Sequence, residues 1–469
     1  MARKNLSAGQ KLGFGIFDLG GNMLFTMMGF WCLKYLTDVA GLAAALAGSA
    51  WMIGKIWDAI SDPMMGFISD RTVTRMGRRR PYLLFGAVPM MLTLWLFFTA
   101  PGIPSQTLLM LWAAGTLILV NTASTVINVP YSSMTPELTD DYHERSSLNG
   151  YRFGCAVIGT IIAGAAVLPL TEMFGGGKHG WSMMGLILGS VMAFVTLLTF
   201  FGTKEKKHTY DDIPVEGIFS TFKAVFTNKP YMILLLTYAL HITALTFLQS
   251  ILAYYTEYIY PAEFVMQLVN LPLIGPLAAN SAGNEAALRG MLTIIAMMSL
   301  LVTAMVFIPV SVVVSKKIGK KRSYQICFVF IGIACIAVSA IGHLLPLELF
   351  LGLLIFAGIG VGFNYVAPFA MVPDTVEFDA AKTGERKEGA YYGMWTFISK
   401  SGMALSGFIS GLILNFGGYA ANTVQTPEAK LAIRFIIGPI PAFIFLCALV
   451  LIQFYSLDER TYKKLMGQP

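Results

Sequence analysis

Three charged residues lie within a stretch of the chain that is otherwise apolar. The segment Trp51-Met-Ile-Gly-Lys-Ile-Trp-Asp-Ala-Ile-Ser-Asp-Pro63 carries Lys55, Asp58 and Asp62 at spacings of three, four and seven residues. On a helix these spacings place all three side chains on one face. Two carboxylates one turn apart, beside a basic group, can form an oxygen-rich cage that holds Na⁺ or carries a proton. A charge in hydrocarbon is costly, so this face is expected to meet a protein interior or a water-filled cavity.

The composition is that of a membrane protein. The chain has 469 residues, of which 56% are hydrophobic and 13% charged, whereas soluble domains carry about 25% charge. Each membrane span needs roughly 20 apolar residues. The sequence therefore predicts an all-α membrane protein with twelve spans, near residues 10–37, 43–69, 82–100, 106–133, 147–171, 181–202, 231–259, 286–315, 323–342, 347–373, 389–417 and 431–456.

The basic residues sort to one side of the predicted membrane. They gather at the termini and in alternate loops, as in Arg75 to Arg80 and Lys316 to Arg322, and the other loops hold few. The positive-inside rule then predicts that both termini are cytoplasmic, in a multi-pass protein of the inner (plasma) membrane. The net charge of +7 is explained by this sorting, so no nucleic-acid partner is expected.

Signs of enzyme chemistry or of a cofactor are absent from the sequence. The five cysteines fall in predicted spans, at spacings that fit neither a metal site nor a disulfide framework. The sequence contains no His/Glu metal set, no nucleophile elbow and no phosphate-binding loop. We therefore expect no cofactor and no enzymatic activity.

The chain repeats itself after about 240 residues. Arg75-Met-Gly-Arg-Arg-Arg-Pro-Tyr82 is echoed by Lys317-Ile-Gly-Lys-Lys-Arg-Ser-Tyr324, and the Pro130–Asp141 segment by Pro368–Asp379. These echoes indicate two parallel six-helix halves. Such halves rock about a central site in alternating access. The predicted organisation is an N-terminal bundle with the cation site at 1–203, a cytoplasmic linker at 204–230, a C-terminal bundle at 231–456 and a cytoplasmic tail at 457–469.

The segments around these charges resemble a known family. Lys55-Ile-Trp-Asp-Ala-Ile-Ser-Asp-Pro63, Gly66-Phe-Ile-Ser-Asp-Arg-Thr72 and the Gly-Arg-Arg-Arg loop are similar to those of the glycoside–pentoside–hexuronide:cation symporters. That family is the melibiose-permease-like branch of the major facilitator superfamily. The likeness extends over nearly the whole chain, and it includes Thr37-Asp38 at the end of span one and Lys400 in span eleven. It implies the major facilitator fold, with two pseudo-symmetric six-helix bundles.

The resemblance also implies roles for individual residues. Asp58, Asp62 and Thr125 match cation ligands, with Asn128 as a further candidate, so Na⁺ is expected at Asp58 and Asp62. Lys55 and Lys400 match the basic residues of a coupling network around the acids. The predicted substrate contacts are Asp18, Asn22, Asn128, Arg152, Tyr365, Trp395 and Lys400.

Asn22 and Asn128 depart from the melibiose pattern, because melibiose permeases carry aspartates at these places. An amide still offers a donor and an acceptor to a sugar hydroxyl. With Lys55, Arg152 and Lys400 retained, the cavity is expected to be more positive. Galactoside specificity is therefore not implied, and a uronide or another solute fits as well.

Each of these residues also has a purely structural interpretation. The two acids could pair with Lys55 and Lys400 and only hold helices together. Arg152 could snorkel to the membrane surface, and Asp18 could either line the cavity or pair with a basic group. Asn22 and Asn128 could be ordinary interhelical hydrogen bonds. His241 fits a packed polar residue better than a proton relay.

Charged residues near the cytoplasmic ends of the spans are predicted to form a gate. Ion pairs among them would hold the outward-open state and break when the halves rock, although the arginines could also anchor lipid headgroups. The predicted gate residues are Asp70, Arg75, Arg78, Arg79, Arg80, Asp140, Glu144, Asp374 and Glu377.

The sequence and the resemblance together predict a symporter. Inward flow of Na⁺ or H⁺ on Asp58 and Asp62 would drive uptake of a sugar, glycoside or uronide by alternating access. The alternative within the same branch is a carrier of lysolipids or other amphiphiles. The expected partners are a small-molecule solute and the lipid bilayer, and the expected functional form is a monomer.

Overall fold

The computed structural model describes residues 6–139, 142–204, 225–271, 275–279, 283–364, 366–383 and 388–457. Every regular element within these ranges is a helix. Ten helical segments are long and apolar enough to cross a membrane, and the bent pair Ser147–Ala165 with Val167–Met173 makes an eleventh. Most of the predicted linker, the predicted tail after Leu457, and the candidate residues Asp140 and Tyr365 lie outside the described residues.

The second predicted span is α3, Ala44–Arg71, with 28 residues. At about 1.5 Å per residue it is long enough to cross the roughly 30 Å hydrocarbon core. It is not among the ten apolar segments, since charged and polar residues interrupt it. Its apolar side chains Ile56, Ile60 and Met64 are exposed, whereas Asp58 is buried. Asp58 on the charged face of α3 is therefore turned into unit 1, and apolar side chains lie on the exposed face.

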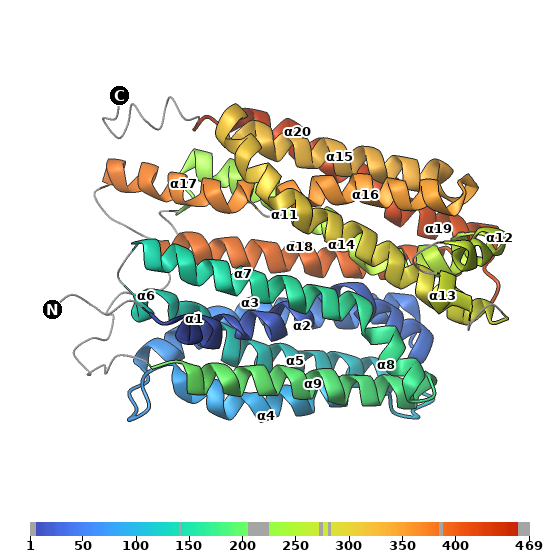
Figure 1. Ribbon diagram of the computed structural model, residues 1–469, viewed down its shortest axis with the longest axis horizontal. Coiled ribbons are helices and arrows are strands. Elements are labelled where there is room, and N and C mark those ends of the chain that lie inside the picture. The colour runs from blue at the N-terminus through green and yellow to red at the C-terminus, as the bar shows by residue number, and fades with distance from the viewer. Residues whose placement is uncertain are drawn as a thin grey trace. The chain divides into compact units, whose positions relative to one another are not determined.

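The chain folds as two compact units, Met1–Glu216 (unit 1) and Gly217–Pro469 (unit 2). In unit 1, α2 packs on α7, α3 on α5, and α4 on both α5 and α9 (Figure 1). The helices of unit 1 are α1 (Ala8–Gly15), α2 (Phe17–Lys34), α3, α4 (Arg80–Phe97), α5 (Gln106–Ser133), α6 (Thr135–Leu138), α7 (Tyr142–Ala165), α8 (Val167–Met173) and α9 (Gly177–Gly202).

Unit 2 repeats this packing. In unit 2, α11 packs on α18, α14 on α16, and α15 on both α16 and α20 (Figure 1), so each pair of unit 1 has a counterpart. This is the packing that a parallel repeat of the chain requires. The longer helices of unit 2 are α11 (Lys229–Tyr254), α14 (Glu285–Ile318), α15 (Lys320–Ile341), α16 (Leu347–Asn364), α17 (Ala367–Thr383), α18 (Glu388–Phe416), α19 (Pro427–Ile437) and α20 (Pro439–Leu451).

The glycine of the repeated loop motif has a positive φ in both units. Gly77 has φ 113° and Gly319 has φ 89°, and they hold the same place in the echoed sequences. A side chain at such a positive φ would be strained, so glycine is the residue that fits the turn. Gly319 directly precedes α15, which starts at Lys320, whereas Gly77 lies three residues before the start of α4 at Arg80.

The structure differs from the predicted spans in local backbone detail and at the end of the tenth span. The first spans of the two units end in π-helical turns, η1 (Tyr35–Val39) and η3 (Tyr255–Ile259). The tenth span, predicted to end at 373, continues through α17 to Thr383, because its polar end remains helical beyond the apolar stretch. The fifth span bends by 47° between α7 and α8.

Candidate functional site

The two carboxylates of α3 meet a single hydroxyl of α5. Thr125 Oγ1 lies 3.2 Å from Oδ1 of Asp58 and 2.9 Å from Oδ1 of Asp62. The α-helical repeat places the two acids one turn apart, so one residue of the facing helix can reach both. Asp58 and Thr125 are buried, and Asp62 is half-buried. The structure thus brings together three of the four predicted cation ligands.

A fourth oxygen at this site was not predicted from the sequence. Ser61 Oγ lies 3.2 Å from Thr125 Oγ1, and it also donates to the main-chain oxygen of Asp58 at 3.3 Å. Ser61 is buried. The signal in the sequence was its position directly before Asp62, three residues after Asp58. A serine in a membrane helix is ordinarily explained by a bond to its own backbone, so position alone did not single it out.

Lys55 lies at the edge of this cluster. Its Nζ is 3.4 Å from Oδ2 of Asp58, with side chains 13% and 9% exposed, and 5.3 Å from the centroid of the Trp51 ring. The ammonium group therefore faces the carboxylate oxygen opposite the one that contacts Thr125. The predicted coupling between Lys55 and the acids has a direct contact at Asp58. Lys400 lies on α18 of unit 2 and is half-buried.

The chemistry of this oxygen cluster suits a hard monovalent cation or a proton. Its members are two carboxylates and two hydroxyls, and hard cations prefer such ligands. In the described part of the chain, no three His, Cys, Asp or Glu side chains gather in a way that could hold a metal ion. The cluster therefore offers the donors for Na⁺ or H⁺ and lacks the nitrogen and sulfur donors that transition metals favour.

Asn22 and Asn128 make local hydrogen bonds. Asn128 Nδ2 donates to Oγ of Ser124 at 2.8 Å, and Asn22 Nδ2 donates to the main-chain oxygen of Asp18 at 3.0 Å. Both side chains are half-buried. Each bond stays within its own helix, so each amide keeps acceptor capacity for another group. Asn128 lies three residues after Thr125, and its predicted cation contact remains a prediction.

Asp18 and Arg152 form an ion pair between α2 and α7. Arg152 Nε lies 2.6 Å from Oδ2 of Asp18, and Tyr131 Oη donates to the same oxygen at 2.6 Å. Arg152 Nη1 also donates to Oγ1 of Thr135 at 3.1 Å. Asp18 thus pairs with a basic group, one of the two alternatives that the sequence left open, and Arg152 is held by protein partners.

Trp395 lies in the core of unit 2. It is 4% exposed, and its ring stacks on Tyr238 with centroids 4.0 Å apart and an interplanar angle of 19°. The ring centroid of Phe369 lies 6.1 Å from that of Trp395, with the two rings inclined at 60°. Tyr238 thus covers one face of the indole ring, and the predicted contact of Trp395 with the substrate remains a prediction.

The arginine loop of unit 1 pairs with Asp70. Arg79 Nη2 lies 2.8 Å from Oδ1 of Asp70, and Arg78 Nη1 donates to the main-chain oxygen of Asp70 at 3.3 Å. Arg80 instead donates to the main-chain oxygen of Phe200 at 3.0 Å, with its guanidinium 4.5 Å from that ring. Arg75 is exposed.

Two further gate residues pair inside their own unit. Glu144 Oε1 accepts from Lys11 Nζ at 3.2 Å in unit 1. In unit 2, Lys320 Nζ lies 2.8 and 2.7 Å from the two oxygens of Asp374, and Glu377 is half-buried on α17. The predicted ion pairs therefore include contacts within each unit, and a role for these residues in holding the halves together remains a prediction.

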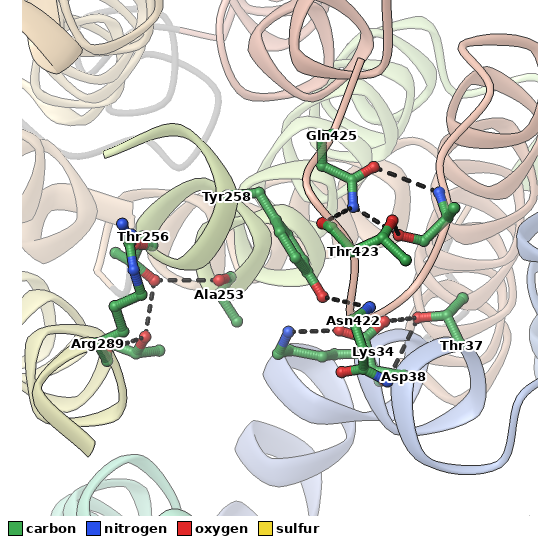
Figure 2. A network of polar contacts seen from close by, with 12 residues as sticks. Lys34, Thr37, Asp38, Ala253, Thr256, Tyr258, Arg289, Asn422, Thr423 and Gln425 are labelled. Carbon is green, nitrogen blue, oxygen red and sulfur yellow. Dashed lines mark hydrogen bonds and ion pairs between the residues drawn. The ribbon is translucent and has the colours of Figure 1, made fainter. Parts of the chain in front are cut away.

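The π-helical ends of α2 and α11 each carry a polar cluster (Figure 2). In unit 1, Lys34 Nζ and Thr37 Oγ1 each lie 2.7 Å from an oxygen of Asp38. In unit 2, Arg289 Nη1 donates to three main-chain oxygens, of Thr256, Glu257 and Tyr260, at 3.2, 2.8 and 2.9 Å. These contacts satisfy groups at helix ends, and they were not predicted from the sequence.

Comparison with known proteins gives relatives along nearly the whole chain. An uncharacterized symporter of Bacillus subtilis, YnaJ, is 30% identical over 475 residues, covering 99% of this chain and 95% of the relative. The isoprimeverose transporter of Lactiplantibacillus pentosus is 27% identical, covering 96% and 89%. A glucuronide carrier protein homolog of Escherichia coli is 29% identical, covering 97% and 94%.

Solved structures share the fold at lower identity. The nucleoside transporter NupG superposes with a TM-score of 0.62 and 16% identity, over 94% of this chain and 98% of that one. These likenesses establish the major facilitator fold. The family described as MFS/sugar transport protein matches residues 13–459. The chain therefore belongs to the MFS/sugar transport protein family.

Proposed function

We propose that this protein is a cation-coupled secondary active symporter that imports a sugar, glycoside or uronide by alternating access. The observation that carries the proposal is the position of Thr125 Oγ1, within 3.2 Å of one oxygen of both Asp58 and Asp62. A hydroxyl has a single hydrogen to donate. Two ionised carboxylates drawn to one hydroxyl repel each other, and a Na⁺ ion or a proton relieves that repulsion.

Coupling then follows from linkage. If the cation and the solute each bind more tightly when the other is bound, the two binding free energies are coupled reciprocally. A carrier that crosses readily only when empty or fully loaded converts this coupling into symport. In this proposal Asp58, Asp62, Thr125 and Ser61 hold the cation, and Lys55 adjusts the charge at Asp58.

The solute is proposed from the family and from the relatives. They include proteins named for isoprimeverose and for glucuronides, and Asn22 and Asn128 offer amides that suit hydroxyl groups. We further propose that the protein lies in the inner (plasma) membrane with both termini cytoplasmic, acts as a monomer and has no enzymatic activity. The N-terminal bundle, 1–203, would hold the cation, and the linker 204–230 would join it to the bundle at 231–456.

Uptake into proteoliposomes tests the proposal. The purified protein is reconstituted, a panel of radiolabelled sugars, glycosides and uronides is offered, and an inward gradient of Na⁺ or of H⁺ is imposed separately. We expect one solute class to accumulate with one of the two gradients. Asp62→Asn and Asp58→Cys should abolish accumulation, while exchange of internal for external solute persists in part, since exchange needs no net movement of the cation.

Glu285→Gln is the matched control, because Glu285 is an exposed acid whose Oε1 pairs with Arg289 Nε at 2.8 Å in unit 2, whereas the oxygen cluster belongs to unit 1. This variant should accumulate solute like the wild type. Unimpaired accumulation in both aspartate variants would refute the coupling site. Accumulation of a lysolipid with no sugar transported would favour the amphiphile alternative.

A further inference from the structure

One turn before the oxygen cluster, α3 and α5 cross at a close contact. Asn121 Nδ2 donates to the main-chain oxygen of Gly54 on α3 at 3.1 Å and to that of Leu117 on its own helix at 2.9 Å. A Cβ at Gly54 would lie 2.9 Å from Leu117 Cβ and 3.2 Å from Asn121 Nδ2. Asn121 is buried. The glycine thus permits the close approach, and the amide links the two backbones there.

The register of this crossing relates it to the cation ligands. Gly54, Asp58 and Asp62 are spaced by four residues along α3, and Asn121 and Thr125 are spaced by four along α5. Residues four apart lie above one another on a helix face. The Asn121–Gly54 hydrogen bond is therefore followed, one turn later, by the Thr125–Asp58 contact.

We propose that Asn121 is a positioning residue for the cation site, on the basis that the site functions as proposed above. Its amide fixes the position of α5 along the axis of α3 and the distance between the two helices. This places the Thr125 hydroxyl between the two carboxylates. The two hydrogen bonds of Asn121 go to main-chain oxygens of Gly54 and Leu117, neither of which is a predicted ligand, so it acts through the helix that carries Thr125.

The geometry leaves little tolerance at Thr125. Its hydroxyl oxygen lies 3.2 and 2.9 Å from the two carboxylate oxygens, and hydrogen bonds weaken beyond about 3.2 Å. A shift of α5 by even a fraction of a helical turn lengthens one of these contacts. The carbonyls of Gly54 and Leu117 lie inside helices and accept main-chain bonds there, so loss of the Asn121 amide leaves neither carbonyl without a partner.

The same pair of helices provides a matched control. Trp57 Nε1 on α3 donates to Oγ1 of Thr122 on α5 at 2.8 Å, at an exposed position. Trp57 does not follow the four-residue spacing of Gly54, Asp58 and Asp62, so its side chain lies on a different face of α3. Trp57→Phe removes one α3–α5 hydrogen bond, as Asn121→Ala does, but on the outer face of the helix pair. A purely structural role predicts similar effects of the two substitutions.

The test measures cation affinity directly, without a known solute. Thermal unfolding of the purified full-length protein is followed while NaCl replaces choline chloride at constant ionic strength, and a parallel series varies pH without Na⁺. A fit of the rise in Tm to the linkage relation between ligand concentration and stability gives the cation concentration that half-saturates the site. We expect Asn121→Ala to raise that concentration about tenfold, as substitutions behind a metal ligand typically do. Trp57→Phe should leave it unchanged, and Asn121→Ser replaces Asn121→Ala if the latter fails to fold.

Each outcome decides the matter. If Asn121→Ala, or Asn121→Ser in its place, binds the cation as the wild type does, or if Trp57→Phe weakens binding equally, the positioning role is overturned while the proposed symport stands. If the wild type is stabilised neither by Na⁺ nor by protons, and Asp62→Asn does not change its response, the proposed cation site falls together with this inference.

Discussion

Arg152 holds Asp18 through both arms of its guanidinium group. Nε lies 2.6 Å from Oδ2 of the aspartate, and Nη2 lies 3.3 Å from Oδ1. The positive charge of Arg152 is therefore balanced inside unit 1. From the sequence, the loss of two aspartates at Asn22 and Asn128 predicted an excess of positive charge around the solute. Because Asp18 balances its charge, Arg152 does not add to the predicted excess of positive charge around the solute.

Replacement of Asp18 by asparagine should destabilise the protein. It leaves a guanidinium without its counter-charge, and removal of one partner from a buried ion pair costs about 3–5 kcal/mol. The side chains of Arg152 and Asp18 are 23% and 15% exposed, so we expect a somewhat smaller loss. Thermal unfolding in detergent should show a clearly lower Tm for Asp18→Asn.

Two further variants control this prediction. Glu285→Gln removes an exposed carboxylate from Arg289, which keeps its three main-chain acceptors. An ion pair with an exposed acid contributes about 0–1 kcal/mol, so the Tm of this variant should change little. The double variant Asp18→Asn with Arg152→Gln should recover part of the lost stability, since no charge then remains unbalanced. Equal Tm values for Asp18→Asn and Glu285→Gln would contradict the assignment.

The two hydroxyls of the oxygen cluster should contribute unequally to cation binding. Thr125 contacts both carboxylates, whereas Ser61 Oγ contacts Thr125 and a main-chain oxygen. Thr125→Val keeps the shape of the side chain and removes its hydroxyl, so we expect a loss of cation affinity of about tenfold or more. Ser61→Ala should cause a smaller loss. Cation titrations of Tm measure both, and a larger effect of Ser61→Ala would contradict this ranking.

Hydropathy and charge were sufficient to place the spans. The segment predicted at 106–133 is α5, Gln106–Ser133, and that predicted at 43–69 matches α3, Ala44–Arg71, to within two residues at either end. The spacing of Asp58 and Asp62 on one helix face also followed from the sequence, because the helical period is fixed. These features depend on local composition and on the helical repeat alone.

What the sequence could not show depends on which helices pack together. The pairing of Asp18 with Arg152 requires α2 to pack on α7, and the bond from Asn121 to Gly54 requires one register of α5 on α3. The family resemblance predicted Thr125 as a cation ligand, but the place of Ser61 in the oxygen cluster was seen only in the structure. The π-helical ends at Tyr35–Val39 and Tyr255–Ile259 change backbone register without changing hydropathy.

The Asp70–Arg79 pair should control the rate of transport if it belongs to the gate. Arg79 is buried, and its Nη2 lies 2.8 Å from Oδ1 of Asp70. Asp70→Arg alone places two positive charges in contact and should slow uptake severely. The exchanged pair, Asp70→Arg with Arg79→Asp, should regain part of the rate. Initial uptake rates in proteoliposomes measure this, and failure of the exchanged pair to exceed Asp70→Arg would indicate that other partners dominate.

His241 should contribute to stability and not to coupling. It is fully buried among Tyr238, Phe328 and Phe445, and its Nδ1 lies 2.8 Å from Tyr324 Oη. Loss of one partner of a buried hydrogen bond costs about 1–3 kcal/mol. His241→Phe and Tyr324→Phe should each lower the Tm, and the double variant should lose less than the sum of the two.

The cation dependence distinguishes this role from a proton relay. A packed histidine leaves the half-saturating cation concentration and the pH profile of uptake as in the wild type, since its ring is buried among aromatic side chains of unit 2, whereas the oxygen cluster belongs to unit 1. If His241 were a proton relay, His241→Phe would shift the pH profile of uptake, whereas Tyr324→Phe would keep the wild-type profile. Such a split between the two variants, measured on uptake at several pH values, would assign His241 to the proton path.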